Sequence, residues 1–264
     1  MKKDAVLEVS TSITNRLLEE IQNRAVRGEP VALARALRKP TNQTAMALVY
    51  EDTVFPPLFD RKLTKRILLA VRDMTQSGAA AGLIESADEE GIAITLAIEM
   101  IKPRLNLLVF GGGHVGQAVA LIAALVGYGV TVIDDREEFA SRQRLPDPRI
   151  KLLVSDYASA AGRLHISSNT AVVIVTRGHQ YDELCLKNVI NSEAGYIGMI
   201  GSRRRVLSVF KKLAGEGFPE AALQNVHAPI GLQIGARSPQ EIAVAILAEI
   251  VRYVNNPTLG QKGE

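Results

Sequence analysis

The stretch Leu107–Ala118 reads LLVFGGGHVGQA: an apolar run, a cluster of glycines and the start of a helix-forming segment. Gly111, Gly113 and Gly116 have the spacing of a dinucleotide-binding turn. In such a turn the first glycine permits the tight bend, the second lets the backbone approach a pyrophosphate, and the third packs the helix against the strand. Phosphates bound there lie on the helix N-terminus, where free N–H groups and the helix dipole favour anions. The stretch therefore predicts a strand, a phosphate-binding turn and a helix, or else the same turn kept for packing alone.

The residues after Asn106 show the pattern of a parallel α/β sheet. Short apolar runs alternate with helix-length segments: LLVF from Leu107, VTVIDD from Val130, KLLV from Lys151, AVVIVT from Ala171 and YIGMI from Tyr196. Continuous apolar strands that alternate with helices are typical of a parallel sheet covered on both faces. A last helix is signalled by Ser238-Pro239-Gln240-Glu241, which is a capping box with proline at the first helical position.

The first hundred residues have weaker patterns and predict a smaller α+β domain. We expect a helix with Leu17, Leu18, Ile21 and Ala25 on one face, strands over Thr44–Asp52 and Gly91–Ile101, a helix capped by Asp60, and a linker of small residues over Ser77–Gly82. The charge and proline of Lys102-Pro103-Arg104 mark the preferred boundary. The chain is therefore predicted to be α/β, with a smaller N-terminal domain over 1–102 and a Rossmann-like parallel-sheet domain over 103–264.

Composition excludes several classes of protein. The chain of 264 residues is 47% hydrophobic and 22% charged, so it can bury a core, and its net charge of +3 is not gathered in a Lys/Arg block that would favour nucleic acid. No apolar run approaches the length of a membrane span, and the N-terminus MKKDAVLEVSTS lacks the apolar region of a signal peptide. The single cysteine, Cys185, fits a reducing compartment, and we expect a cytoplasmic protein in which this thiol belongs to the core.

Asp134 ends the strand after the glycine turn, where an acid in this fold meets ribose hydroxyls. Asp134 and Asp135 favour a free 2′-hydroxyl, hence NAD or an adenosine-like group. Arg136 keeps NADP open, because an arginine beside the acid can receive a 2′-phosphate. His114 stands where the turn usually has a small or apolar residue, and it either contacts the ligand or is tolerated at an exposed helix start.

Further polar residues follow the other strands, and ligands of open α/β sheets bind outside the carboxyl ends of strands. His179 with Asp182 is a candidate base and its orienting acid, and His227 precedes a turn with Pro229 and Gly231. Ser202 begins a helix with arginines in its first turn, which is either an anion site or a solvated basic face. The residues expected to contact a cofactor are Gly111, Gly112, Gly113, His114, Val115, Gly116, Asp134, Asp135, Arg136, Thr176, Arg177, Gly178, His179, Gly201, Ser202, Arg203, Arg204, Pro229 and Gly231. No metal site is expected, because no metal-ligand spacing is present.

Five segments in order resemble the XdhC/CoxI family of xanthine dehydrogenase accessory factors: GGGHVGQAVA, VTVIDDREEFA, TRGHQYDELCL, YIGMIGSRRR and HAPIGLQIGARSPQEIAVAILAEI. The resemblance covers roughly Leu105 to Val254 and implies a small N-terminal domain before a Rossmann domain, often in a dimer. It does not extend to the first hundred residues, where family members usually carry GSxPR-like and GGCxE-like segments. Here LARALRKPTNQTAMALVYEDTVFPPLFDRKLTKRI contains neither, and no cysteine precedes Cys185.

The resemblance implies an accessory protein that binds molybdenum cofactor (molybdopterin), assists its sulfuration or insertion, and delivers it to a molybdenum hydroxylase apoenzyme. The implied partners are that apoenzyme and a cysteine desulfurase, and a homodimer is the default assembly. Two alternatives stay open from the residues themselves. One is an NAD(H)-dependent oxidoreductase with His179 or His227 as acid or base, and the other is a nucleotide-sensing regulatory module.

Overall fold

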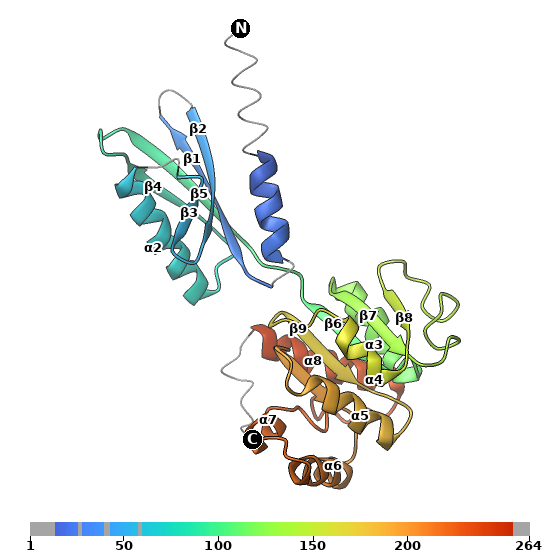
Figure 1. Cartoon of the computed structure of the whole chain (residues 1–264). Coiled ribbons are helices and arrows are strands. Elements are labelled where there is room, and N and C mark those ends of the chain that lie inside the picture. The colour runs from blue at the N-terminus through green and yellow to red at the C-terminus, as the bar shows by residue number, and fades with distance from the viewer. Residues whose placement is uncertain (1–13, 26–27, 40–42, 58–59, 256–264) are drawn as a thin grey trace. The chain divides into compact units, whose positions relative to one another are not determined.

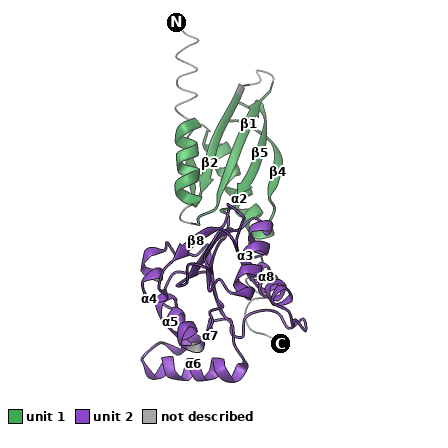
Figure 2. Cartoon of the chain, turned by 90° about the vertical axis from the view of Figure 1, so that its right-hand side faces the viewer, with its two compact units in different colours: residues 1–103 green, residues 104–264 purple. Residues whose placement is uncertain are grey.

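A computed structural model describes residues 14–25, 28–39, 43–57 and 60–255 of the chain. The chain divides into two compact units, Met1–Pro103 and Arg104–Glu264, which are coloured separately in Figure 2. Each unit has its own sheet and its own core.

Unit 1 is built on an antiparallel sheet in the order β3-β2-β1-β5-β4 (Figure 1). Its elements are β1 (Val31–Arg38), β2 (Gln43–Tyr50), β3 (Thr53–Phe55), α2 (Arg61–Ser77), β4 (Ala81–Ala87) and β5 (Ala93–Ile101), after a helix over residues 14–25. Helix α2 buries Leu63 and Ile67 in one core cluster of the unit. Leu17, from the first helix, packs instead with Val31 and Leu48 in a second cluster. Adjacent strand residues point to opposite faces, so the two helices cover the two faces of the sheet.

Most elements predicted for unit 1 are present, with one correction. Asp60 is the N-cap of α2, since its carboxylate accepts a hydrogen bond from the Leu63 N–H at 2.8 Å. The predicted linker Ser77–Gly82 is wrong at both ends, because Ser77 is the last residue of α2, and Ala81 and Gly82 already belong to β4 and pair with β5. Helix α2 lies over this part of the strand, since a Cβ at Gly82 would be in ordinary contact with the Met74 sulfur, at 3.5 Å.

Unit 2 has a parallel sheet in the order β10-β9-β6-β7-β8. Its elements are β6 (Asn106–Phe110), α3 (His114–Val126), β7 (Gly129–Asp134), β8 (Lys151–Val154), α4 (Tyr157–Ala160), η1 (Ala161–Arg163), β9 (Thr170–Ile174), α5 (His179–Val189), β10 (Tyr196–Met199), α6 (Arg203–Gly215), α7 (Glu220–Gln224) and α8 (Pro239–Asn255). Numbered from β6, the strands have the order 3-2-1-4-5, which is the order of the first five strands of a Rossmann sheet, and the switch point lies between β6 and β9. The predicted α/β class, with an N-terminal α+β part and a C-terminal Rossmann-like sheet, is confirmed.

Helices cover both faces of this sheet, as Figure 2 shows for α3 and α8 on one side and α4 and α5 on the other. Val109, Val132 and Val173 pack towards α3 and α8, while Phe110, Ile133 and Ile174 pack towards α4, α5 and α6. Strands that are buried on both faces explain the continuous apolar runs in the sequence.

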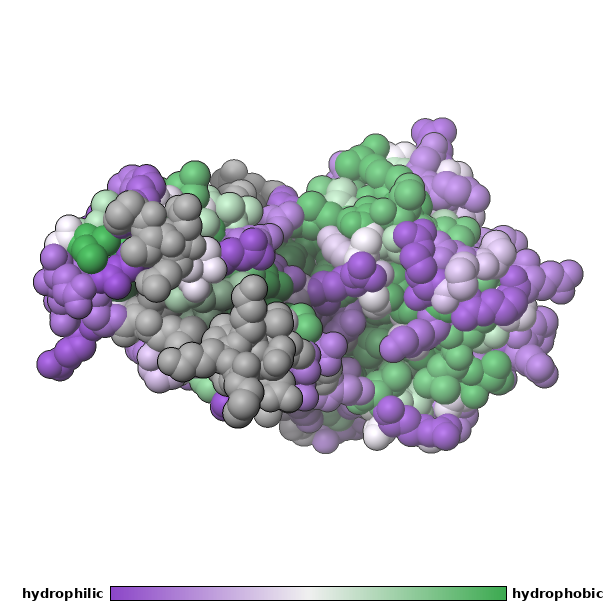
Figure 3. All heavy atoms as spheres, turned by 90° about the horizontal axis from the view of Figure 1, so that it is seen from above, coloured by the Kyte–Doolittle hydropathy of each residue, from purple (hydrophilic) through white to green (hydrophobic). Residues whose placement is uncertain are grey.

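The predicted capping box begins α8. The Glu241 N–H donates to Ser238 Oγ at 3.2 Å, and the Ser238 N–H donates back to Glu241 Oε2 at 2.9 Å. Within the described residues, no helix has both the length and the apolar content needed to cross a membrane. Exposed apolar side chains occur on both units, among them Leu83, Leu125 and Leu207, and Figure 3 shows apolar patches interrupted by hydrophilic ones on the face that it presents.

Candidate functional site

The carboxyl edge of the unit 2 sheet carries the segments that the sequence singled out. Following the strand order, Gly201–Ser202 comes after β10, Thr176–Gly178 after β9, Gly111–Gly113 after β6 and Asp134–Arg136 at β7. Pro229–Gly231 lies beside the end of β10, because the Ile230 N–H donates to the carbonyl of Met199 at 3.0 Å. Segments more than a hundred residues apart in the sequence therefore share one edge.

The three fingerprint glycines occupy three different environments. Gly111 has φ +110°, and a Cβ there would lie 2.5 Å from the Val175 carbonyl oxygen. A Cβ at Gly116 would overlap the Gly111 carbonyl oxygen, so this glycine lets α3 pack on the turn. At Gly113 a Cβ would meet nothing within 4 Å, and this residue caps α3 without a side-chain hydrogen bond. The turn is therefore closed at its first and third glycines and open at the second.

Two neighbours of these glycines have different surroundings. A Cβ at Gly112 would come within 3.0 Å of the Phe139 carbonyl, so the chain itself covers this residue. His114 is the exposed first residue of α3, and Val115 is half-buried against the core beneath α3 and α8.

Asp134 is completely buried and holds the turn together. Its carboxylate accepts hydrogen bonds from the Gly112 N–H at 2.8 Å and from the Arg136 backbone N–H at 3.1 Å. The Arg136 guanidinium adds two more, Nε to Oδ1 at 2.9 Å and Nη2 to Oδ2 at 3.2 Å. Burial raises the pKa of Asp134, but these hydrogen bonds outweigh it and the net shift is downward. The ribose contact expected of Asp134 stays a prediction, and in this structure both carboxylate oxygens serve the turn and Arg136.

Asp135 and Arg177 form an ion pair across the carboxyl end of β6. Arg177 Nη2 lies 2.9 Å from Asp135 Oδ2 and also donates to the Tyr181 hydroxyl at 2.9 Å. The guanidinium lies 4.6 Å from the centre of the Tyr181 ring. Both charged side chains are partly exposed, at 25% for Asp135 and 35% for Arg177. This is a charge pair at the rim of the switch point.

Asp182 lies on α5, and its carboxylate links the segment after β9 to the start of α6. Its carboxylate accepts hydrogen bonds from the Thr176 N–H at 3.2 Å, from the Thr176 hydroxyl and from the Arg205 guanidinium. The Asp182 side chain is 1% exposed, and its counter-ion Arg205 is partly exposed, at 23%. His179 is the first residue of α5, and its side chain lies outside what the structure describes, so the expected pairing of His179 with Asp182 stays a prediction.

The three arginines in the first turn of α6 differ in their surroundings: two are exposed to solvent and one points towards α5. Ser202 is the N-cap, accepting from the Arg205 N–H at 3.3 Å. Arg203 and Arg204 are exposed, while Arg205 turns inward to Asp182. Gln180, Ser202, Arg204, Arg205 and Lys212 are among the residues that line a groove of about 690 Å³ between α5 and α6. The sequence could not tell which arginine turns inward.

His227 belongs to an aromatic and acidic cluster. Its Nδ1 lies 2.7 Å from Glu249 Oε1, and the other Glu249 oxygen accepts a hydrogen bond from the Gly231 N–H. The imidazole stacks on Tyr196 with ring centres 4.4 Å apart, and Tyr253 packs edge-on against it at 5.0 Å. Glu249 therefore fixes both ends of the segment from His227 to Gly231, a role that the sequence analysis did not foresee.

Two further buried groups lie beneath the rim. Tyr157 is 2% exposed, its hydroxyl has no hydrogen-bond partner among the described residues, and burial together with the charges of Asp134 and Asp135 raises its pKa. Cys185 is fully buried, and burial near Asp182 and Asp135 raises its thiol pKa well above the ordinary value. The expected core role of Cys185 is confirmed. No group of three or more His, Cys, Asp and Glu side chains suited to a metal ion occurs within the described residues.

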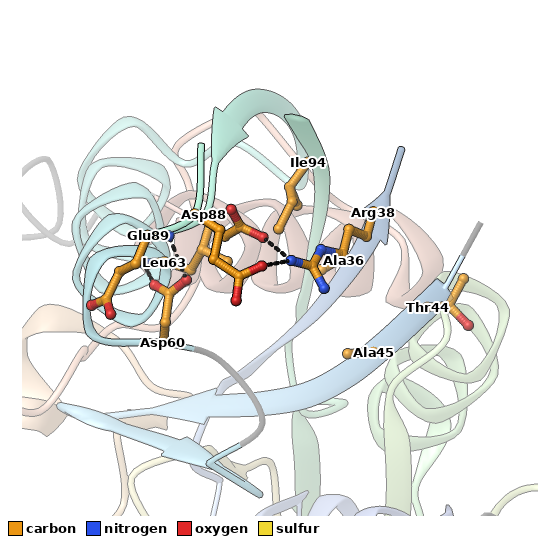
Figure 4. A pocket seen from close by; sticks show the side chains of 10 residues that line it. Ala36, Arg38, Thr44, Ala45, Asp60, Leu63, Asp88, Glu89 and Ile94 are labelled. Atoms are coloured by element: carbon orange, nitrogen blue, oxygen red, sulfur yellow. Dashed lines mark hydrogen bonds and ion pairs between the residues drawn. The ribbon is translucent and has the colours of Figure 1, made fainter. Parts of the chain in front are cut away.

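Unit 1 has a pocket of about 560 Å³ between α2 and the sheet, drawn in Figure 4. Arg38 reaches into it and forms ion pairs with Asp88, at 2.8 Å, and with Glu90. Asp60 caps α2 and also accepts a hydrogen bond from the Glu89 N–H at 3.1 Å. These acids therefore bind partners within their own unit.

A parallel sheet with a glycine turn at its switch point defines unit 2 as a Rossmann-like domain. The family model described as XdhC Rossmann domain matches residues 107–250, more than half of the chain. The chain belongs to the XdhC family, which confirms the resemblance found in its sequence.

Three curated proteins are similar to this chain. The uncharacterized protein YqeB of Escherichia coli K12 is 30% identical over 213 residues, which are 77% of this chain and 38% of that protein. A protein of Bacillus subtilis, named as a probable subunit of xanthine dehydrogenase, is 29% identical over 155 residues, 59% of this chain and 44% of that protein. The molybdenum cofactor insertion chaperone PaoD of Escherichia coli K12 is 24% identical over 149 residues, 56% of this chain and 40% of that protein. The matched parts thus cover about four-tenths of the length of these relatives.

The same architecture occurs in a crystal structure described as a xanthine dehydrogenase from Bacillus halodurans. That structure superposes with a TM-score of 0.55 at 16% sequence identity and covers 91% of this chain and 94% of the other. At this identity the likeness concerns the fold alone.

Proposed function

We propose that this chain is an accessory protein for the maturation of a molybdenum hydroxylase, binding molybdenum cofactor along the carboxyl edge of unit 2 and assisting its sulfuration or insertion. The observation that carries the proposal is the open Gly113 at the switch point of an XdhC Rossmann domain. The open second glycine leaves space for a phosphate of the pterin cofactor against the start of α3. His114, Gly178, Gly201 and Ser202 are the neighbouring positions along this edge.

The relatives support a role in cofactor handling. PaoD is named an insertion chaperone for molybdenum cofactor, and a second relative is named as a probable part of a xanthine dehydrogenase. The client apoenzyme, a cysteine desulfurase as sulfur donor, and a homodimeric, cytoplasmic state are parts of the proposal taken from the family resemblance.

The chemistry of the edge favours a carrier over a redox enzyme. Asp134 and Asp182 are both bound to arginines and backbone or hydroxyl groups, so neither carboxylate is poised as a general base. Cys185 is buried with a raised thiol pKa, whereas a thiol that accepts or transfers sulfur needs an exposed thiolate. We therefore propose that sulfur reaches the bound cofactor from the donor without passing through Cys185.

Delivery is tested by reconstitution. The chain is loaded anaerobically with molybdenum cofactor and mixed with the apoenzyme of a xanthine dehydrogenase-type hydroxylase, and the recovered activity is compared with that from free cofactor. The proposal expects faster and more complete recovery with the loaded chain, and Cys185→Ser should perform as well as the wild type. Equal recovery from free cofactor would contradict a delivery role.

A second candidate, a nucleotide-sensing module or NAD(H)-dependent oxidoreductase, is favoured by the glycine spacing and the strand order. Oxidation of NADH with a small carbonyl substrate would support the enzyme. A change of oligomeric state with the NADH/NAD ratio would support the sensor.

A further inference from the structure

The Asp135–Arg177 pair lies across the place where a ligand of the glycine turn must enter. Asp135 follows β7 and Arg177 follows β9, and these strands flank β6 in the sheet. Neighbouring strands are about 4.8 Å apart, so the pair spans the carboxyl end of β6. Gly111 lies between the ends of β7 and β9. Its N–H donates to the Ile133 carbonyl oxygen at 2.8 Å, and a Cβ on it would lie 2.5 Å from the Val175 carbonyl oxygen.

The pair is poorly anchored on its acidic side. Asp135 Oδ2 accepts the hydrogen bond from Arg177, but Asp135 Oδ1 is buried without a hydrogen-bond partner among the described residues. Arg136 Nε lies 3.9 Å from this oxygen but only 2.9 Å from Asp134 Oδ1. Asp134, by contrast, accepts four hydrogen bonds. Of the two neighbouring acids, Asp135 is therefore the one whose interactions can change.

Arg177 is equally able to change partners. It is partly exposed, and besides Asp135 it contacts Tyr181, through the ring face and the hydroxyl. A phosphate at Gly113 would offer this guanidinium a second anionic partner with better bidentate geometry than the single bond to Asp135.

We propose that Arg177 is a phosphate-binding residue of the crevice and that Asp135 competes with the ligand for it. Arg177 moves from Asp135 to the anionic group of the ligand, and Arg136 remains to compensate Asp135. The crevice then selects ligands that carry a phosphomonoester or pyrophosphate over uncharged analogues. This inference rests on the ligand site of the proposed function. It adds the chemical class of the ligand and the residue, Arg177, that binds the anionic group of that ligand.

If Asp135 competes with the ligand for Arg177, removal of its charge should tighten ligand binding. Removal of an acid that binds ribose hydroxyls should instead weaken it. The test titrates the full chain with sodium pyrophosphate and, separately, with ADP, at fixed ionic strength in a calorimeter. Arg177→Gln should weaken both ligands by roughly tenfold or more, the usual loss for a hydrogen bond to a charged group. Asp135→Asn should tighten both by about two- to fivefold, the range of a partly exposed ion pair.

Arg252→Gln serves as the matched control, because it removes the same charge from the exposed last turn of α8 and should leave both affinities unchanged. Asp135→Ser, which also removes the charge, takes the place of Asp135→Asn if that variant does not fold.

Three results would overturn the proposal: an Asp135 variant that leaves pyrophosphate affinity unchanged, one that weakens ADP alone, or no pyrophosphate binding by wild type and Asp135→Asn alike. The second result would assign Asp135 to ribose hydroxyls. Binding of molybdenum cofactor by the wild type is measured in a separate titration, so failure of this inference is distinguished from failure of the proposed function.

Discussion

Adding a side chain at Gly113 should abolish ligand binding and leave the fold intact, whereas adding one at Gly116 should damage the fold. The contrast follows from the two environments. A Cβ at Gly113 meets nothing within 4 Å, and the backbone there, at φ −68° and ψ −173°, suits any L-residue. A Cβ at Gly116 comes under 3.0 Å from a backbone carbonyl, which cannot rotate away.

The magnitudes separate the two variants clearly. Gly113→Val replaces a helix N-cap glycine by an apolar residue, at a cost of roughly 0.5–1 kcal/mol. Gly116→Ala drives a Cβ into the Gly111 carbonyl oxygen, so its cost lies at the upper end of the overpacking range, about 3 kcal/mol or more, and the gain of up to about 1 kcal/mol from the better helix former leaves a net loss of about 2 kcal/mol or more. For a unit of this size each kcal/mol lowers the Tm by about 2–4 °C. Gly113→Val should therefore melt about 1–4 °C below the wild type, and Gly116→Ala about 4–8 °C below it or more.

The assay pairs thermal denaturation with a titration of isolated molybdenum cofactor. Gly113→Val should lose affinity by more than about tenfold, because a valine side chain excludes a phosphate from the N–H groups of the turn, and a hydrogen bond to a charged group contributes about 1.5–3 kcal/mol. Unchanged affinity of Gly113→Val would refute the phosphate-binding turn. A Tm loss as large as that of Gly116→Ala would show that the second glycine also serves packing.

Three other outcomes are expected from the described contacts. Arg205→Leu removes the guanidinium from the buried Asp182 carboxylate and should lower the free energy of unfolding by roughly 2–4 kcal/mol, measured by urea denaturation, and addition of Asp182→Asn should recover part of the loss. The pKa of Glu241 is lowered by hydrogen bonds from the N–H groups of Ser238 and Arg237, so its contribution to stability is present above its ordinary pKa of 4.5 and is lost as the pH falls through the lowered value. The stability difference between wild type and Glu241→Gln should accordingly shrink in acid, and an undiminished difference would exclude this role of the carboxylate. Cys185, buried with a raised thiol pKa, should react with a thiol reagent only after unfolding, and rapid labelling of the native chain would contradict its burial.

Local signals made much of the fold predictable. Gly116 packs against the carbonyl of Gly111, five residues earlier, and the capping box at Ser238 and Glu241 spans one turn, so a short stretch of sequence contains each interaction. Strand β1 was harder, because its core positions include Ala32 and Ala34, whose small side chains give little contrast with their neighbours. The end of the linker before β4 was misassigned for the same reason.

The partners within the candidate site depended on distant parts of the chain. Asp182 meets Arg205, and His227 meets Glu249, only after strands and helices have been stacked. The spacing of the motif placed Asp134 at the end of a strand. It could not reveal that Gly112 and Arg136 donate hydrogen bonds to both carboxylate oxygens of Asp134. Sequence motifs therefore located the edge of the site, and tertiary packing decided which side chains face it.

The most direct test of the central claim is an equilibrium titration of the purified chain with anaerobically isolated molybdenum cofactor, NAD and NADH, together with molybdenum analysis of the complex. We expect stoichiometric, reversible binding of the pterin cofactor, bound molybdenum in equal amount, and no comparable affinity for NAD or NADH. Binding of NAD or NADH alone would contradict a carrier of molybdenum cofactor and would assign the open glycine turn to a nucleotide.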